Sequence, residues 1–464
     1  MHLSIDDQED TALATRVILV RHGTSTYNVL RKVQGHCDES DLTEGGQQDA
    51  AKVGVALQGI RLDAAYSSPL KRATQTAQII LEQWSKVDSS PVELQFTDNL
   101  KEINLLHWEG MTFDDIAAQF PEDHRVWRDA PHDLCLQKQT PEGTEPFYPV
   151  RSLFEQAKQF WRETLPHHAD QTILVVAHSG IIRSLVCTAI GLEPYYYKAF
   201  HQSNCAINVL NFGGQLGDPV QIESYNLTAH LGNNVPEFRG KEGIRMLLVR
   251  HGETQWNREK RFQGQIDVPL NPHGQEQGRK TAQFLQEVPI DRAVTSPLLR
   301  PKETAELILE KHPDVTLELS ENLKEISHGL WEGKLESEIA LDYATELDQW
   351  KRSPHVVQMP EGENLQQVWE RAIAAWQEIL ESTPIQPGKV TTVMVVAHDA
   401  INKAILCHLA DWGPEQFWVF KQGNGAVSVI DYAKGAQGRP LIQALNITSH
   451  VSGGVLDRTA AGAL

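Results

Sequence analysis

The sequence predicts an α/β protein built from two tandem domains, each with a mostly parallel central sheet. Short β-branched runs such as RVILV and TILVV alternate with longer amphipathic patterns such as ATQTAQIILEQW, which is the order of βαβ units. The short runs are apolar throughout, as expected of parallel strands buried on both faces. An ordered set of motifs occurs twice and divides the 464 residues into two halves of ordinary domain size.

The repeated motifs also set the expected domain limits. We expect one domain over residues 15–230 and a second over 244–450. Between them, the linker 231–243 reads LGNNVPEFRGKEG and carries the Gly, Asn and Pro residues typical of a connection. The C-terminal segment 451–464, VSGGVLDRTAAGAL, is expected to be a flexible tail.

Composition narrows the class of function. The formal net charge is −19 and no block of Lys and Arg occurs, which argues against nucleic acid and anionic membranes as partners. The start, MHLSIDDQED, lacks the order of a signal peptide and no apolar run approaches membrane-spanning length, so we expect a cytoplasmic protein. Five cysteines without CxxC spacing favour neither a disulfide framework nor a zinc site. The oligomeric state stays open.

The first repeated motif is VRHGTSTYN at 20–28, which returns as VRHGETQWN at 249–257. In both copies an Arg-His pair directly follows a buried strand, and VVAHSG and VVAHDA each place a second histidine in the same way. Ligands bind at the carboxyl ends of strands in open α/β sheets. The residues placed there are Arg21, His22 and His178 in the first half and Arg250, His251 and His398 in the second.

A second pair of motifs adds an arginine at the start of a helix. In SSPLKRA we expect Ser68 to cap the helix and Pro69 to open it, with Arg72 in the first turn beside free backbone N–H groups. SPLLRPK supplies Arg300 in the same way. Ser179 is expected to cap the helix after the second histidine. Two arginines and two histidines can then converge on one phosphate dianion.

A histidine in such a position can also act as a nucleophile. Neutral imidazole accepts a phosphoryl group once its other nitrogen donates to an acceptor, and no metal is needed. The leaving alkoxide then requires a proton, which one carboxyl group can supply and later recover from water. We expect Glu102 of LKEINLLHWEG and Glu325 of LKEISHGLWEG to do this. Neither a GxxxxGK loop nor an HExxH motif is present.

Together these motifs resemble the histidine phosphatase superfamily, also called phosphoglycerate mutase-like, over nearly the whole chain. The resemblance implies a three-layer α/β/α sandwich in each half and hydrolysis of phosphomonoesters through a phosphohistidine, with no metal and no cofactor. It implies His22 and His251 as nucleophiles and Glu102 and Glu325 as the acid/base groups. The implied phosphate pockets consist of Arg21, Asn28, Arg72 and His178 in the first half and Arg250, Asn257, Arg300 and His398 in the second.

The expected partner is a small phosphorylated metabolite. The LKE and WEG loop is similar to the phosphatase-type branch, and the tandem arrangement with FYPVRSLF and QSNCAINVLNF resembles phosphatases of 2-carboxyarabinitol 1-phosphate, which implies a sugar or sugar-acid phosphate. A phosphoglycerate mutase, a phosphoserine-type phosphatase, and a protein in which one half only senses a phosphometabolite remain alternatives. Tyr148 and Arg151 are candidate substrate contacts or, alternatively, part of a packing turn.

The second half departs from the superfamily pattern at two points. Asp399 follows the second histidine where Ser or Gly is usual; it would either repel a dianion or cap the helix. Pro301 directly follows Arg300 and could re-aim it, because proline disfavours helical geometry in the preceding residue. We therefore expect the first half to be the better phosphatase.

Overall fold

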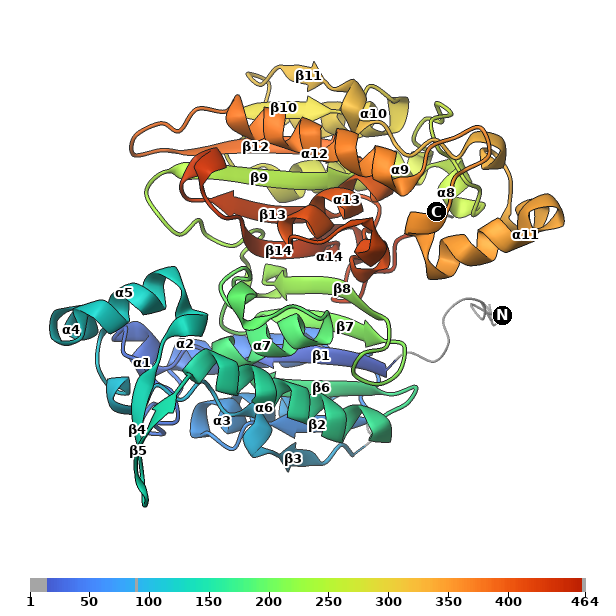
Figure 1. Cartoon of the computed structure of the whole chain (residues 1–464). Coiled ribbons are helices and arrows are strands. Elements are labelled where there is room, and N and C mark those ends of the chain that lie inside the picture. Colours follow the sequence, from blue (N-terminus) through green and yellow to red (C-terminus); the bar gives the residue numbers. More distant parts are fainter. Residues whose placement is uncertain (1–14, 88–90, 461–464) are drawn as a thin grey trace. The chain divides into compact units, whose positions relative to one another are not determined.

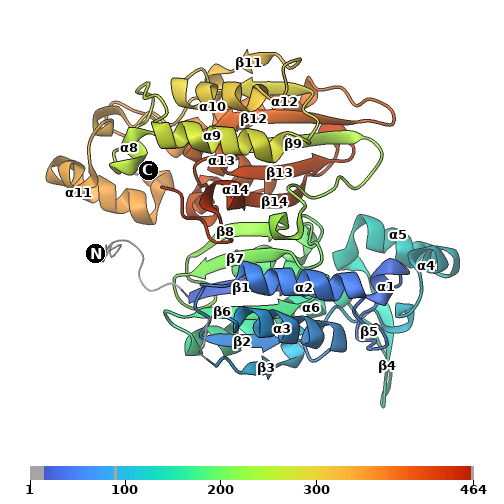
Figure 2. The ribbon, with the colours of Figure 1, turned by 180° about the vertical axis from the view of Figure 1, so that it is seen from behind.

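The computed structural model describes residues 15–87 and 91–460 (Figures 1 and 2). The chain forms two compact units. The first runs up to Tyr197 and includes Val209–Gln221, and the second comprises Lys198–Asn208 and the chain from Ile222 onward. The limits 15–230 and 244–450 expected from the motifs stay a prediction. Among the described residues, no helix is both long and apolar enough to cross a membrane.

The first unit contains a sheet in the order β7-β1-β6-β2-β3. β1 pairs with β6, β6 with β2 and β2 with β3, all in parallel, and Val20 of β1 lies opposite Val176 of β6. The apolar run of β1 is completely buried from Val17 to Val20, as expected of a central strand. The strands are β1 (Thr15–Arg21), β2 (Ala64–Ser67), β3 (Leu94–Phe96), β6 (Thr172–Ala177) and β7 (Ile207–Phe212).

Helices cover both faces of this sheet. α6 and α7 lie together on the face seen in Figure 1, and α2 and α3 lie together on the face seen in Figure 2. The three-layer α/β/α prediction is therefore confirmed for this unit. The helices are α1 (Thr26–Val29), α2 (Glu44–Ala56), α3 (Lys71–Trp84), α4 (Phe113–Gln119), α5 (Pro121–Asp129), α6 (Pro149–Thr164) and α7 (Ser179–Ala189). A hairpin of β4 (Leu136–Thr140) and β5 (Gly143–Phe147) precedes α6.

The second unit repeats the design with the strand order β11-β10-β12-β9-β13-β14-β8. The first four are parallel, whereas β13, β14 and β8 continue the sheet in antiparallel pairs. The strands are β8 (Val220–Leu227), β9 (Gly243–Arg250), β10 (Arg292–Thr295), β11 (Leu317–Leu319), β12 (Val390–Ala397), β13 (Val427–Tyr432) and β14 (Leu441–Ile447). The helices are α8 (Gln255–Arg258), α9 (Pro272–Leu285), α10 (Leu299–Leu309), α11 (Glu336–Arg352), α12 (Leu365–Glu381), α13 (Asp399–Leu409) and α14 (Ser449–Ser452).

The segment expected to be a tail makes contacts with the second unit as far as it is described. The Asp457 backbone N–H donates to Glu223 Oε1 at 2.9 Å, and the Asn424 N–H donates to Thr459 Oγ1 at 3.0 Å. Residues 461–464 lie outside the described part of the chain.

Candidate active site

His22 stands at the carboxyl end of β1 and is only 2% exposed. Its Nδ1 lies 2.7 Å from the carbonyl oxygen of Gly23. Burial, followed by the charges of Arg72 and Arg21, lowers the pKa of His22 well below its usual value, so the ring is neutral. Because a carbonyl oxygen can only accept, the proton sits on Nδ1 and the lone pair on Nε2. The ring is therefore prepared to act as a nucleophile through Nε2.

His178 follows β6 at the first turn of α7 and is completely buried. The centroid of its ring is 5.1 Å from that of His22. Its Nε2 lies 2.8 Å from Ser68 Oγ, and burial together with Arg72 lowers its pKa well below the usual value. When the serine hydroxyl donates to Nε2, the ring carries its proton on Nδ1. That N–H can then donate to a phosphate oxygen.

Arg72 lies in the first turn of α3, as predicted, and is completely buried. Its two terminal nitrogens donate to the carbonyl oxygens of Cys37 at 3.0 Å and Gly35 at 2.9 Å, which fix the guanidinium beside the two histidines. The expected caps are wrong. Leu70 is the N-cap, and Ser68 faces His178 instead because the two strand ends lie side by side.

The Glu102 carboxylate is held by backbone N–H groups. Its Oε1 accepts from Ile103 at 2.8 Å and from Ile181 at 3.2 Å, and its Oε2 accepts from Gly180 at 3.0 Å. Two of these donors belong to the first turn of α7. A Cβ added at Gly180 would stand 2.4 Å from Glu102 Oε1 and 2.7 Å from the Tyr197 hydroxyl, so a side chain here would require both groups to move.

An asparagine and a glutamine complete the cluster. Asn28 Oδ1 accepts from the Ser25 N–H and hydroxyl at 3.1 Å each, in a capping box at the start of α1. The Ser25 hydroxyl is also 3.0 Å from Gln34 Oε1. Each amide oxygen lies within hydrogen-bonding distance of the Ser25 hydroxyl, whose single proton is donated to one of them at a time. Sequence reasoning missed Gln34, although VQG at 33–35 and FQG at 262–264 repeat it.

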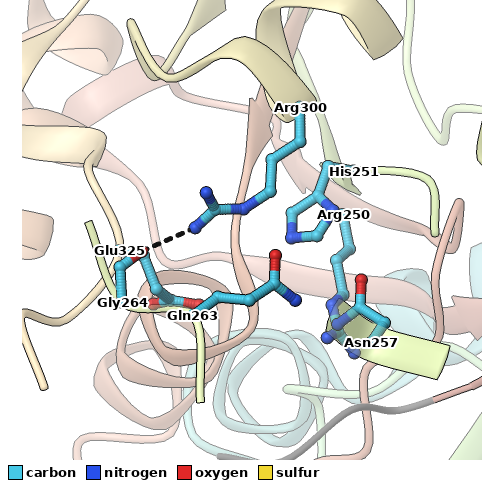
Figure 3. A pocket seen from close by; sticks show the side chains of 7 residues that line it. All are labelled: Arg250, His251, Asn257, Gln263, Gly264, Arg300 and Glu325. Atoms are coloured by element: carbon cyan, nitrogen blue, oxygen red, sulfur yellow. Dashed lines mark hydrogen bonds between the residues drawn. The ribbon is translucent and has the colours of Figure 1, made fainter. Parts of the chain in front are cut away.

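The second half builds the same cluster around one pocket (Figure 3). His251 Nδ1 lies 2.7 Å from Gly252 O, and burial with Arg300 and Arg250 lowers its pKa well below the usual value. His398 Nε2 lies 2.9 Å from Ser296 Oγ, with its ring centroid 5.3 Å from that of His251. The residues that line the pocket are Arg250, His251, Asn257, Gln263, Gly264, Arg300 and Glu325.

Pro301 does not deflect Arg300, contrary to the expectation. Arg300 remains inside α10 and donates to the carbonyl oxygens of Gly264 at 2.8 Å and Ile266 at 3.1 Å, as Arg72 does in the first half. Proline is tolerated here because it stands in the first turn, where backbone N–H groups have no partner within the helix. Burial lowers the pKa of Arg300 to about 10.

Asp399 is the main difference between the two clusters. His398 is the N-cap of α13 and makes no side-chain cap, and Asp399 is the first helical residue, so the expected capping role is wrong. Its carboxylate is 3% exposed and forms ion pairs with Arg250 at 3.3 Å and with Lys403 at 2.6 Å. The equivalent Ser179 likewise follows the N-cap, His178, instead of capping the helix.

The acid of the second half is held less tightly. Glu325 Oε1 accepts from Ile326 N at 3.0 Å, but Oε2 lies 3.5 Å from Ala400 N. Burial and then the charge of Asp399 raise the pKa of Glu325. Ala400 stands where the first half has Gly180, and Phe417 stands where it has Tyr197. The second half therefore carries a methyl group and lacks a hydroxyl at this point.

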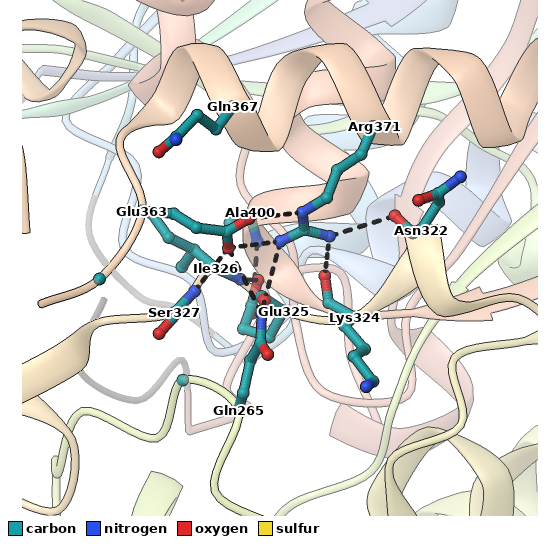
Figure 4. A network of polar contacts seen from close by, with 12 residues as sticks. Gln265, Asn322, Lys324, Glu325, Ile326, Ser327, Glu363, Gln367, Arg371 and Ala400 are labelled. Atoms are coloured by element: carbon teal, nitrogen blue, oxygen red, sulfur yellow. Dashed lines mark hydrogen bonds and ion pairs between the residues drawn. The ribbon is translucent and has the colours of Figure 1, made fainter.

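A charged residue clamps the loop that carries Glu325 (Figure 4). Arg371 of α12 donates to Glu325 O at 2.9 Å and forms two bonds of 2.8 Å with the Glu363 carboxylate. In the first half the amide of Gln156 does this work, with bonds to Asn99 O at 3.1 Å and Lys101 O at 2.8 Å. The loop that carries the acid is thus supported by a side chain of the following helix in both halves. That side chain is a cation in the second half and a neutral amide in the first.

Tyr148 and Arg151 contact each other and a neighbouring turn. Arg151 donates to His132 O at 2.9 Å, pairs with Asp133 at 2.9 Å, and stacks 4.7 Å from the centroid of the Tyr148 ring, which is 38% exposed. Their role in substrate contact stays a prediction. Within the described residues, no group of three or more His, Cys, Asp or Glu side chains is arranged to hold a metal ion.

Comparisons with known proteins agree with this geometry. The profile of the histidine phosphatase superfamily (branch 1) matches residues 17–226 and again 246–448. A 2-carboxy-D-arabinitol-1-phosphatase of Triticum aestivum is 30% identical over 95% of this chain and 87% of its own, and a probable one of Arabidopsis thaliana is 28% identical over 97% and 90%. Phosphoserine phosphatase 1 of Hydrogenobacter thermophilus is 34% identical over 47% of this chain and 94% of its own.

Proposed function

The chain belongs to the histidine phosphatase superfamily and is a phosphoric monoester hydrolase, and we propose that His22 and His251 are its phosphoryl acceptors. The observation that carries this proposal is the bond of 2.7 Å between each Nδ1 and the next carbonyl oxygen. It orients a neutral ring with its Nε2 lone pair beside two arginines. The phosphate would lie among Arg21, Asn28, Arg72 and His178 in the first half and among Arg250, Asn257, Arg300 and His398 in the second.

The reaction then proceeds in two displacements. His22 Nε2 attacks phosphorus, the bond to the ester oxygen breaks, and Glu102 donates its proton to that oxygen, so that an alcohol leaves. Glu102 next accepts a proton from water, whose oxygen attacks phosphorus while the bond to Nε2 breaks. Inorganic phosphate and a neutral histidine remain. Glu325 and His251 do the same in the second half.

We propose a sugar phosphate or sugar-acid phosphate as the substrate, with 2-carboxy-D-arabinitol 1-phosphate as the first candidate. Support comes from the relative of that name in Triticum aestivum, which aligns with 95% of this chain. We also propose functional domains over 15–230 and 244–450. The odd number and irregular spacing of the cysteines, typical of proteins kept reduced, support a cytoplasmic location.

A panel of phosphorylated metabolites tests the function. Purified protein with excess EDTA is incubated with 2-carboxy-D-arabinitol 1-phosphate, xylulose 1,5-bisphosphate, phosphoserine and 3-phosphoglycerate, and inorganic phosphate is measured. We expect full activity without divalent metal and the highest kcat/KM for a sugar-acid phosphate. Strict dependence on Mg²⁺ would overturn the histidine mechanism. Conversion of 3-phosphoglycerate to its isomer without phosphate release would identify a mutase instead.

A further inference from the structure

Arg183 lies on α7 of the first unit, and none of the acidic side chains that the structure describes pairs with it. Its guanidinium stands 5.8 Å from the centroid of the Tyr197 ring. Its Nε is buried without a hydrogen-bond partner, and no ion pair or hydrogen bond of Arg183 is found among the described residues. The residue as a whole is half-buried. A partly desolvated guanidinium of this kind favours an anion that would satisfy it.

Tyr197 connects Arg183 to the acid of the active site. The Cβ position of Gly180 is 2.7 Å from the Tyr197 hydroxyl and 2.4 Å from Glu102 Oε1, so the hydroxyl and the carboxylate flank the same glycine. In the proposed reaction Glu102 delivers its proton to the ester oxygen. Tyr197 and Arg183 therefore lie close to the group that would protonate the leaving group.

In the second unit, the cation equivalent to Arg183 is paired with a carboxylate of the protein itself, that of Asp399. Lys403 occupies the position of Arg183, and its ammonium is 2.6 Å from Asp399, which stands where the first half has Ser179. The same ammonium lies 4.5 Å from the centroid of the Trp418 ring and 4.9 Å from that of Phe417. The cation at this position is thus already neutralised and enclosed.

We propose that Arg183, assisted by the Tyr197 hydroxyl, binds a carboxylate on the leaving group of the first-half substrate, whereas Asp399 takes that place in the second half. This inference rests on the proposed phosphatase function and specifies its substrate class, a phosphorylated hydroxy acid. In the second half, Lys403 is already paired with Asp399, and the negative charge of Asp399 repels an incoming carboxylate. Both effects disfavour binding of that carboxylate. The two halves then differ in selectivity for acidic leaving groups.

Matched inhibitors test the proposal in the full-length chain. The His251→Ala variant isolates the first half, and hydrolysis of p-nitrophenyl phosphate is inhibited with 3-phosphoglycerate or with glycerol 3-phosphate, which has an alcohol in place of the carboxylate. Arg183→Gln should raise the Ki of 3-phosphoglycerate roughly 10- to 100-fold, the loss expected for hydrogen bonds to a charged group, and raise that of glycerol 3-phosphate much less. Arg183→Lys should restore part of the discrimination.

Two further variants complete the test. Arg162→Gln removes an exposed arginine of α6 and should leave the ratio of the two Ki values unchanged. In the His22→Ala chain, which isolates the second half, Asp399→Ser should lower the Ki of 3-phosphoglycerate relative to glycerol 3-phosphate. An unchanged ratio in Arg183→Gln, or in Asp399→Ser, overturns the inference while hydrolysis of p-nitrophenyl phosphate still upholds the proposed function. Absence of any hydrolysis by the unmodified chain overturns the proposed function itself.

Discussion

The two halves agree closely where phosphate would bind and differ where the leaving group would lie. The histidine rings are 5.1 Å apart in the first half and 5.3 Å in the second, and each nucleophile candidate makes a bond of 2.7 Å to the next carbonyl oxygen. By contrast, the first turn of α7 carries Ser179 and Gly180, and that of α13 carries Asp399 and Ala400. The comparison teaches that substitutions in one helix turn can change the surroundings of the acid and of the leaving group without moving the nucleophile.

The largest expected effect comes from removing the nucleophiles. His22→Ala should eliminate phosphohistidine in the first half and leave it in the second, and His251→Ala should do the reverse. Each change should lower turnover by that half by several orders of magnitude, since a positioned water lacks the reactivity of the imidazole. His22→Ala should remove more than half of the total activity, because Asp399 competes with phosphate for Arg250. Peptide mapping after labelling with a ³²P substrate shows which half is phosphorylated, and release of inorganic phosphate measures the remaining activity.

The double variant His22→Ala/His251→Ala serves as the control and should be inactive. Label retained on the first half of His22→Ala would mean that another residue accepts the phosphoryl group there. Equal loss from the two single variants would contradict the ranking of the halves and leave the nucleophile assignments intact.

The next largest effect concerns proton donation. In the His251→Ala chain, Glu102→Gln should lower kcat/KM for an alkyl phosphate roughly 10²- to 10⁴-fold, because the alkoxide then leaves without a proton. The same change should be much milder with p-nitrophenyl phosphate, whose nitrophenolate needs no proton to leave. Stopped-time phosphate assays on both esters measure the contrast. Equal losses on both esters would show that Glu102 positions the site without donating a proton.

A smaller effect sharpens the electrostatic comparison. Burial and the charge of Asp399 raise the pKa of Glu325, so this acid keeps its proton to higher pH. In the His22→Ala chain, Asp399→Ser removes the neighbouring negative charge, which lowers the pKa of Glu325 and should move the alkaline limb of kcat/KM to lower pH. Rate profiles from pH 4 to 9 on an alkyl phosphate measure the shift. A limb that stays in place would show that Asp399 does not control the acid.

How much the sequence could predict differs between the two sides of the site. Arg21, His22 and His178 were predictable because a buried strand fixes where its last residues emerge. The pairing of Asp399 with Arg250 was not, because a carboxylate after a histidine reads equally well as a helix cap, and only the neighbouring strand brings the arginine within reach. The direction of a side chain depends on partners far away in the chain, which local patterns do not record.

The same reason explains the errors at helix starts and the missed contacts of Arg183. Ser68 has every local feature of a cap, yet the end of β6 brings His178 to its hydroxyl. Arg183 looks like an ordinary polar residue of an amphipathic helix. Its contact with Tyr197 depends on how the chain turns after α7, in a segment without regular periodicity.

The smallest expected effect concerns stability. His328, where the first half has Leu105, is completely buried, and both of its ring nitrogens lack hydrogen bonds among the described residues. Burial lowers its pKa to about 3. Below about pH 6.5 the unfolded chain therefore binds a proton on this histidine, whereas the folded chain does not. The free energy of unfolding falls as pH drops, by about 1.4 kcal/mol per pH unit for this histidine.

Substitution of His328 tests that dependence. His328→Leu should reduce the slope between pH 6.5 and 5 and change stability little at pH 7.5, as measured by urea unfolding. The reverse change, Leu105→His, should steepen the slope in the first half. Parallel slopes in the wild type and His328→Leu would mean that the buried ring finds a partner that keeps it protonated.

The glycine between Glu102 and the Tyr197 hydroxyl restricts the history of this turn. A methyl group at position 180 would stand 2.7 Å from the hydroxyl and 2.4 Å from Glu102 Oε1. Replacement of the tyrosine by phenylalanine removes only the first of these collisions, so the Ala-Phe pair of Ala400 and Phe417 also requires the acid to stand further off. The distance of 3.5 Å between Glu325 Oε2 and Ala400 N agrees with such a displacement. A change at this glycine is therefore tied to changes at both of its neighbours.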